Sequence, residues 1–102
     1  MFELRDYAVV PGKMEALLQR FRECTIPLLP EHNIHNVAYW FPQGDEHRLL
    51  YLVRHEGDPA ANWESFRNDP RWIAARDASQ ADGPLTSSIQ STYLSDAGLL
   101  PG

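Results

Sequence analysis

Cysteine and clustered positive charge are both scarce in this chain of 102 residues. It has one cysteine, Cys24, so no intramolecular disulfide can form, which is compatible with a reducing compartment. It has 9 Lys and Arg against 14 Asp and Glu, a formal net charge of −5, and the basic residues stand singly except for Arg20 and Arg22. Because nucleic-acid binding usually needs a basic patch, we exclude nucleic acid as a partner.

Long hydrophobic runs are also missing. The longest fully apolar runs, 37–41 and 49–53, are far shorter than the roughly 20 residues that cross a bilayer. The first residues, Phe2–Asp6, are too charged to form the apolar region of a signal peptide. We therefore expect a cytoplasmic protein that has no membrane partner.

Several motifs that indicate a particular chemistry are absent. The sequence has no Gly-x-Ser-x-Gly, which excludes an α/β-hydrolase nucleophile elbow, and no Gly-rich phosphate loop, since Gly12 stands alone. His32 and His35 lie three residues apart, with His47 and His55 downstream, but no Cys-x-x-Cys or His-Glu-x-x-His accompanies them. We expect neither a metal site nor a cofactor.

Apolar and aromatic residues, by contrast, are plentiful. Hydrophobic residues make up 43% of the chain, with three Trp, four Tyr and four Phe, which indicates a packed globular fold. The length predicts one domain over residues 1–102, ending in a tail from about residue 95. A chain this short buries only about two-thirds of its unfolded surface, so its own core leaves little margin and a homodimer is an early expectation.

The periodicity of the apolar residues predicts the order β-α-β-β-α-β. Alternating or β-branched segments predict strands over residues 2–10, 34–41, 48–55 and 87–94. An apolar stripe at helical spacing predicts a helix over residues 13–29, which Pro27 should kink. The pairs Asp58-Pro59 and Asp69-Pro70 predict two further helix starts. This order is typical of an α+β, ferredoxin-like fold with a four-stranded antiparallel sheet.

In such a fold both helical segments cover one face of the sheet, and the other face needs a partner. We expect the open face to carry Val9, Tyr51 and Val53, together with Val37 or Tyr39. Because these side chains are too apolar to be left to water, a second copy packed sheet to sheet would cover them. The sequence thus predicts a homodimer with a shared, barrel-like interior.

The candidate site consists of polar and aromatic strand residues expected to point into that interior, if Phe2 and Leu4 face the helices. A cavity with these groups suits a flat, polar organic molecule. The catalytic candidates are His55 as acid or base, Arg5 as the group that stabilises an anionic enolate or carboxylate, and Tyr51; the substrate-binding candidates are Glu3, Tyr7, Tyr39 and Trp40.

A purely structural interpretation stays open beside this one. Glu3 and Arg5 can form an ion pair inside the dimer while Tyr51 and His55 merely pack, since buried ion pairs often specify register. A register slip of one residue would also exchange the two faces of every strand. Three aromatic residues at helical spacing, together with Cys24, are expected in the core rather than at a substrate: Trp63, Phe66 and Trp72.

Several segments carry a family resemblance. Two of them are Glu3-Leu4-Arg5-Asp6-Tyr7 followed by Pro11-Gly12-Lys13, and Asn36-Val37-Ala38-Tyr39-Trp40. The first is similar to the E-L-R-T-Y and P-G-K of the NIPSNAP family, and the second to its N-V-G-Y-W. Further similar segments are Leu50-Tyr51-Leu52, Asn62-Trp63 with Phe66, Asp69-Pro70-Arg71-Trp72 and Ala81-Asp82-Gly83-Pro84-Leu85. The likeness covers about residues 2–94. Asp6 in place of Thr, Ala38 in place of Gly and a tail without P-T-D-F-S-P depart from the pattern.

The resemblance implies the dimeric α+β barrel superfamily, which holds cofactor-free monooxygenases, isomerases, cyclases, dehydratases and haem-degrading enzymes. It therefore favours a bacterial, cofactor-independent enzyme of isomerase, cyclase or monooxygenase type that acts on a small polar aromatic or carbonyl compound. Two alternatives remain: a non-catalytic binding or assembly protein built from the same dimer, and a haem-binding or haem-degrading protein.

Overall fold

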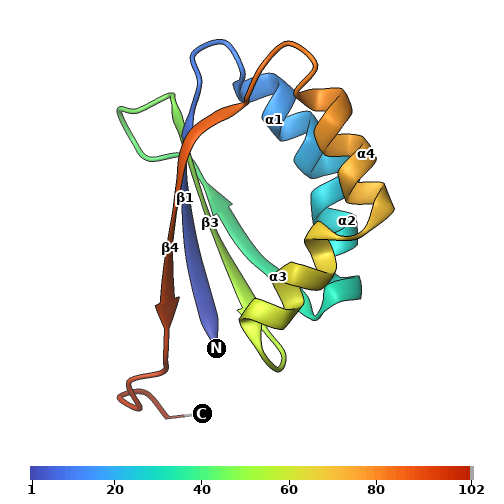
Figure 1. Ribbon diagram of the computed structural model, residues 1–102. Coiled ribbons are helices and arrows are strands. Elements are labelled where there is room, and N and C mark those ends of the chain that lie inside the picture. Colours follow the sequence, from blue (N-terminus) through green and yellow to red (C-terminus); the bar gives the residue numbers. More distant parts are fainter. Residues whose placement is uncertain (102) are drawn as a thin grey trace.

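The fold is a single antiparallel sheet with its helices gathered on one face (Figure 1). The computed structural model describes residues 1–101. The strands are β1 (Phe2–Val9), β2 (Ile34–Trp40), β3 (Arg48–His55) and β4 (Thr86–Leu94). The helices α1 (Met14–Arg20) and α2 (Ile26–Leu28) follow β1, and α3 (Pro59–Arg67) and α4 (Pro70–Ser79) follow β3. The strand order β2-β3-β1-β4 confirms the predicted ferredoxin-like architecture.

The helix starts form where the proline pairs predict them. The side chain of Asp58 accepts a hydrogen bond from the amide of Ala60, and that of Asp69 accepts one from the amide of Arg71. Each aspartate thereby satisfies an amide that the first turn leaves without a helical partner, while proline at the first helical position needs none.

The segment between α1 and β2 is less regular than the predicted single helix. A π-helical turn, η1 (Phe21–Thr25), joins α1 to α2, and a 3-10 turn, η2 (Leu29–His32), follows. Pro27 has no amide hydrogen to close an α-helical bond, and the turn before it widens so that the amide of Ile26 reaches the carbonyl of Phe21. Asn33 then ends the helical segment in the left-handed region, with φ 63°.

The sheet faces are the reverse of the prediction. Glu3, Tyr7 and Val9 point toward the helices and are at most 7% exposed, as are Tyr51 and Val53 on the paired strand β3. The residues that alternate with these along β1 and β3 point to the open face. Its apolar side chains there are Phe2, Leu4, Leu50 and Leu52. Both residue sets of β1 contain apolar side chains, so period-two alternation alone left the choice of face undecided.

Strand β2 changes its register in the middle. The pairing with β3 shifts between Asn36 and Ala38, so that Val37 has no partner and Tyr39 lies opposite Tyr51. This bulge puts Tyr39 on the helix side of the sheet and Trp40, opposite Leu50, on the open side.

The helices do not cover the sheet evenly. They lie over β2, β3 and β1, whereas β4 runs along the edge and is exposed over residues 87–94 (Figure 1). Within residues 1–101, no helix has the length and hydrophobicity needed to cross a bilayer.

Candidate functional site

Glu3 is the centre of a buried polar network between the sheet and the helices. It is 0% exposed, and its carboxylate accepts hydrogen bonds from four side chains on β3, α3, β1 and β4. The donors are His55 Nε2 at 2.7 Å, Trp63 Nε1 at 2.7 Å, Arg5 Nη1 at 2.9 Å and Ser91 Oγ at 2.5 Å. A carboxylate with four donors is compensated for its loss of water, so Glu3 is stable in the core.

These donors decide the charge of Glu3. Burial raises the pKa of the carboxyl, but the hydrogen bonds from Ser91, Trp63, His55 and Arg5 outweigh it, and the pKa lies below the ordinary 4.5. The site therefore holds an ionised carboxylate at neutral pH, which serves as the counter-ion of Arg5.

Arg5 links this carboxylate to a pair of tyrosines. Its Nε donates to Tyr51 Oη at 2.7 Å and its Nη2 to Tyr7 Oη at 3.4 Å, and the two phenol oxygens lie 2.9 Å apart. Its guanidinium carbon also stands 4.3 Å from the ring centroid of Trp63. Arg5, Tyr7 and Tyr51 form a hydrogen-bonded group that we call the Arg–Tyr cluster.

The cluster has one phenol proton to spare. Two hydroxyl groups carry two protons, and the hydrogen bond between Tyr7 and Tyr51 uses one of them. Burial raises the pKa of Tyr51 well above its ordinary value of 10, and Tyr7 adds to this shift while Arg5 opposes it. The pKa of Arg5 is raised as well, because Tyr51, Tyr7 and Glu3 more than offset its burial. The cluster is thus a protonated, positively charged hydrogen-bond donor.

A cavity of about 220 Å³ adjoins the cluster between the sheet and the helices. Its walls are aromatic, and its polar groups are mainly arginines. The lining residues are Arg5, Tyr7, Arg20, Phe21, Thr25, Tyr51, Trp63, Phe66, Arg67, Trp72, Arg76, Gln80, Thr86 and Ile89. Aromatic walls with a few converging polar groups are typical of a small-molecule site.

The predicted site residues fall into three groups. Arg5, Tyr7 and Tyr51 lie together on the cavity, within the protomer rather than in a space between two sheets. Glu3 and His55 lie behind them: His55 is enclosed, with Nε2 bound to Glu3 and Nδ1 at 3.2 Å from the amide nitrogen of Asn62. Because this amide nitrogen is a donor, the ring proton sits on Nε2. His55 therefore positions Glu3 and does not reach the cavity.

Tyr39 and Trp40 form the third group, which lies outside the cavity. The ring of Tyr39 stacks on that of Tyr51, with centroids 5.0 Å apart, and its hydroxyl donates to Asn36 Oδ1. Burial, and secondarily Tyr7, raises the pKa of Tyr39 above its ordinary value. Trp40 is 48% exposed. Tyr39 thus supports the cluster from behind, and Trp40 belongs to the open sheet face.

Sequence reasoning missed the helical half of the cavity. Trp63, Phe66 and Trp72 were assigned to the core; they are packed there, and they also form cavity walls. Arg20 is not among the predicted site residues, yet it is 9% exposed and its guanidinium carbon lies 4.8 Å from the ring centroid of Trp72. Its position one residue before Phe21, at the edge of the apolar stripe, was the available signal.

His32 also has structural partners. His32 Nδ1 lies 2.6 Å from Ser65 Oγ and its Nε2 lies 2.9 Å from Asp69 Oδ2, an arrangement that resembles a Ser–His–Asp triad. None of the pockets described in this structure is lined by Ser65, and Asp69 also caps α4 and binds Arg71, so we interpret the group as a clamp between η2 and the helices. Residues 1–101 contain no cluster of three or more metal-ligating side chains of the His, Cys, Asp or Glu type.

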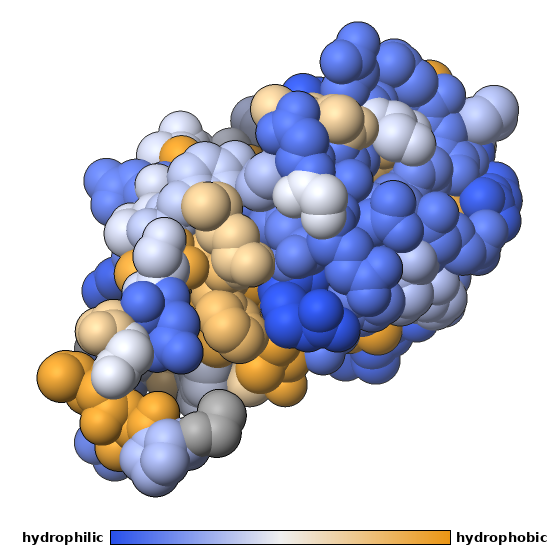
Figure 2. Space-filling view, turned by 90° about the horizontal axis from the view of Figure 1, so that it is seen from below, coloured by the Kyte–Doolittle hydropathy of each residue, from blue (hydrophilic) through white to orange (hydrophobic). Residues whose placement is uncertain are grey.

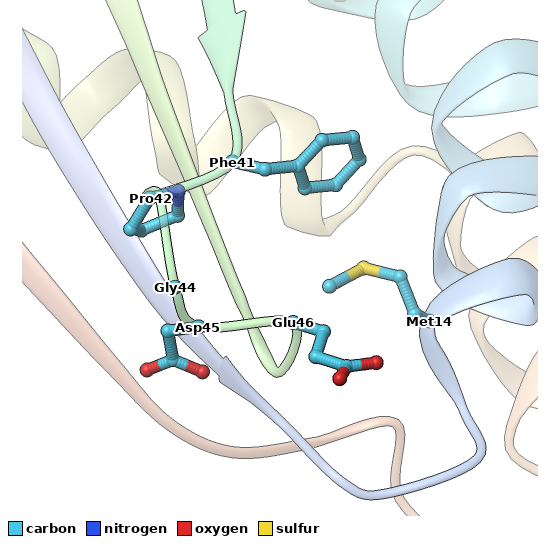
Figure 3. A pocket seen from close by; sticks show the side chains of 6 residues that line it. All are labelled: Met14, Phe41, Pro42, Gly44, Asp45 and Glu46. Atoms are coloured by element: carbon cyan, nitrogen blue, oxygen red, sulfur yellow. The ribbon is translucent and has the colours of Figure 1, made fainter.

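A second, wider hollow lies between the β2–β3 hairpin and α1 (Figure 3). The side chains of Phe41 and Met14 point toward each other across it, while the carboxylate of Asp45 points away (Figure 3). Phe41 is 57% exposed, so this hollow is an open surface with few converging polar groups. The cavity at the Arg–Tyr cluster is the better candidate.

Comparison with known proteins defines the class. The fold is similar to solved α+β structures, among them protein Atu4242 from Agrobacterium tumefaciens, with TM-score 0.79 and 20% identity over 98% of this chain and 96% of that one. A protein from Nitrosomonas europaea, whose name proposes an antibiotic biosynthesis monooxygenase, matches with TM-score 0.67 and 13% identity over 95% of this chain and 99% of that one. No curated protein matches.

The family model settles the membership. The NIPSNAP model matches residues 2–101, so the chain belongs to the NIPSNAP family and fits the dimeric α+β barrel superfamily. An uncharacterised NIPSNAP domain protein from Burkholderia xenovorans is also similar, with TM-score 0.78 and 18% identity over 99% of this chain and 98% of that one. At these identities the solved structures bear on the fold alone.

Proposed function

We propose that this protein is a cofactor-independent enzyme, of isomerase, cyclase or monooxygenase type, that acts on a small aromatic or carbonyl compound in the cavity at the Arg–Tyr cluster. The observation that carries the proposal is the spare phenol proton of Tyr7 and Tyr51, held beside the positive charge of Arg5 on an aromatic cavity. Preorganised donors of this kind stabilise an oxygen that gains negative charge during a reaction.

The step that we assign to the cluster is stabilisation of an enolate. When a water molecule or hydroxide ion from the solvent takes a proton from the carbon next to a carbonyl, the electron pair of the broken C–H bond moves to the carbonyl oxygen, and that oxygen accepts a hydrogen bond from the spare phenol proton. Arg5 supplies positive charge behind that phenol, and Glu3 with His55 holds Arg5 in place. Tyr7, at 7% exposure against 1% for Tyr51, is the more accessible of the two phenols.

The test is proton exchange in a probe ketone. We expect the protein to catalyse exchange of the α-protons of phenylpyruvate in D₂O, followed by ¹H NMR. Tyr7→Phe should slow the catalysed rate about a hundredfold, the usual cost of one oxyanion donor. The matched control is Tyr93→Phe, since Tyr93 is 50% exposed on β4 and outside the cavity. Binding of phenylpyruvate without any catalysed exchange would refute the enolate step.

A non-catalytic binding protein is the second candidate, and one observation favours it. The cavity lining contains no Asp, Glu, His or Cys, so the usual general bases are absent from it. The binding protein predicts saturable binding of the same probe and no rate above that of buffer, so the exchange experiment separates the two candidates.

Haem binding is less compatible with this site. The lining offers no His, Cys or Met as an axial ligand, and both tyrosine hydroxyls are engaged with Arg5. A titration with haem that produced a Soret band dependent on Tyr7 or Tyr51 would reverse this assessment.

We further propose that the protein works in the cytoplasm as a homodimer that packs its open sheet faces together. The residues that support this are apolar and lie opposite the helices: Phe2, Leu4, Trp40, Leu50 and Leu52. Seen from below, hydrophobic residues gather on one side of the molecule and a broad hydrophilic area lies beside them (Figure 2). Stable monomers rarely expose a contiguous patch of this kind.

Light scattering after size-exclusion chromatography tests the dimer. Leu52→Arg places a charge in the middle of the open face and should give a monomer. Ala74→Arg, on the exposed side of α4, is the matched control and should leave the dimer intact. A wild-type protein that is monomeric at micromolar concentration would contradict the proposal.

A further inference from the structure

Two polar groups on the cavity have no partner within the described chain. Arg20 Nε and Thr25 Oγ1 are both buried and make no hydrogen bond within residues 1–101. Arg20 is 9% exposed and Thr25 4% exposed, and both line the cavity. A buried donor without an acceptor costs free energy, so two of them on one cavity indicate that something else binds there.

Arg20 is also a buried charge without a counter-ion. Its Nη1 donates to the neutral hydroxyl of Ser79 at 3.1 Å, and its guanidinium lies against Trp72. None of the ion pairs within residues 1–101 includes Arg20 or Arg67. Burial lowers the pKa of Arg20, the direction expected for a charge held away from water without a counter-ion.

The whole cavity is positive, although the chain is acidic. Its lining includes four arginines, Arg5, Arg20, Arg67 and Arg76, and no Asp or Glu. Arg5 is paired with Glu3 and Arg76 with Asp77, whereas Arg20 and Arg67 have no carboxylate partner within residues 1–101. Because the whole chain carries a net charge of −5, this positive field is a local property of the cavity.

The two ends of the cavity differ in what they still offer a ligand. At the Arg–Tyr cluster, Arg5 already uses Nε, Nη1 and Nη2 on Tyr51, Glu3 and Tyr7. At the other end, Arg20 still has Nε and further donors, and Thr25 a hydroxyl, without protein partners. An anionic group of a ligand therefore finds more free hydrogen-bond donors at the Arg20 end, whereas a carbonyl or phenol oxygen suits the Arg–Tyr cluster.

The size and walls of the cavity limit the rest of the ligand. An apolar cavity of about 150 Å³ is known to accept benzene. The volume of about 220 Å³ found here leaves room for one ring with a carboxylate and little more. Phe21, Trp63, Phe66 and Trp72 supply the flat faces against which such a ring packs.

We propose that the cavity binds a small monoanion with one planar ring, and that Arg20 and Thr25 bind its carboxylate while the ring lies between the aromatic walls. This inference rests on the proposed function, because it uses the same cavity, and it adds the class of ligand. The π-helical turn η1 contributes to this binding site, because its wider turn brings Thr25 to the cavity only five residues after Arg20.

The experiment compares two probes that differ in charge, benzoate and benzamide, by isothermal titration calorimetry on the full-length protein. We expect benzoate to bind at least tenfold more tightly, since a hydrogen bond to a charged group is worth about that factor or more. Arg20→Met should weaken benzoate binding about tenfold or more and change benzamide binding less than about threefold. The matched control is Arg22→Met, on the same helical segment, whose side chain is 58% exposed and paired with Glu15.

A second variant keeps the test valid even if Arg20→Met does not fold correctly. Thr25→Val deletes a buried hydroxyl that has no partner, so the folded state should be as stable as wild type or more so, while benzoate affinity falls severalfold. A residue with only a structural role would not combine weaker binding with unchanged stability.

The outcomes separate this inference from the proposed function. Equal affinity for benzoate and benzamide, or equal effects of Arg20→Met and Arg22→Met, would overturn the anion inference and leave the cavity as a site for neutral compounds. Acetate that binds as tightly as benzoate would overturn the assignment of the ring. If neither benzoate nor benzamide binds, the inference is wrong, and the proposed function fails with it if phenylpyruvate also neither binds nor exchanges its α-protons faster than in buffer.

Discussion

Replacing Glu3 by glutamine tests the buried network most directly. The amide of Glu3→Gln keeps one oxygen, which can still accept from His55 and Trp63. Its NH₂ group, however, takes the place of the oxygen that binds Arg5 and Ser91, so two donors face each other. Arg5 also loses its only carboxylate partner within the described chain.

The magnitude follows from the burial of the pair. Removing one partner of a buried ion pair costs about 3–5 kcal/mol. We expect about 3 kcal/mol, the lower end of that range, because Arg5 keeps its hydrogen bonds to Tyr51 and Tyr7. A domain of this size has a free energy of unfolding of about 5–15 kcal/mol, so the variant should fold but with a large part of its stability lost.

Urea unfolding, followed by far-UV circular dichroism and tryptophan fluorescence, measures this loss at one fixed protein concentration. Glu64→Gln is the matched control, because Glu64 is exposed on α3, and it should stay within about 0.5 kcal/mol of wild type. A loss below about 1 kcal/mol for Glu3→Gln would refute the idea that Glu3 holds the network together.

The pH dependence provides an independent check. The native pKa of Glu3 is lower than its ordinary value, so the ionised form stabilises the native state above about pH 4.5, and this stability is lost as the pH falls through the native pKa. The difference in unfolding free energy between wild type and Glu3→Gln should therefore be full at pH 7 and shrink below about pH 4.5. A difference that is the same at pH 7 and pH 3 would contradict this reasoning.

Three further predictions concern single elements. Asn33→Ala should cost about 1 kcal/mol in urea unfolding and Asn33→Gly close to nothing, because the backbone at this position has φ 63°; equal losses would contradict a left-handed requirement. Absorbance at 295 nm should show Tyr39 and Tyr51 still protonated where exposed tyrosines ionise, near pH 10, because burial raises the pKa of both; a single transition that includes them would disprove this. Asp58→Ala should cost about 1 kcal/mol as a lost helix cap, and Asp69→Ala more, since Asp69 also binds His32 and Arg71; equal costs in urea unfolding would show that the cap is its only role.

The features that the sequence predicts correctly are those that depend on neighbouring residues. Strand and helix positions follow from neighbouring residues, and the caps at Asp58 and Asp69 formed where predicted. The sequence also predicts correctly that Arg5, Tyr7 and Tyr51 lie together, because period-two alternation keeps them on one face of paired strands.

The direction of that face is a non-local property, and here the prediction was wrong. Phe2 and Leu4 are expected to face the helices, which places Glu3 on the opposite side, yet Glu3 accepts from donors on β3, α3 and β4, up to 88 residues away in the chain. No local pattern indicates that three distant donors will meet one carboxylate. For the same reason the cavity was expected between two sheets, whereas it lies between a sheet and its own helices.

The position of β1 in the sheet has a consequence for the growing chain. The first strand lies in the middle, between β3 and β4, so one of its two edges waits for the last strand to be synthesised. Until Ser91 has emerged from the ribosome, Glu3 lacks one of its donors and the cavity lacks Thr86 and Ile89. Since contacts this distant in sequence form late and slowly, the nascent protein presents an unpaired edge of its central strand, which is open to incorrect pairing until β4 is in place.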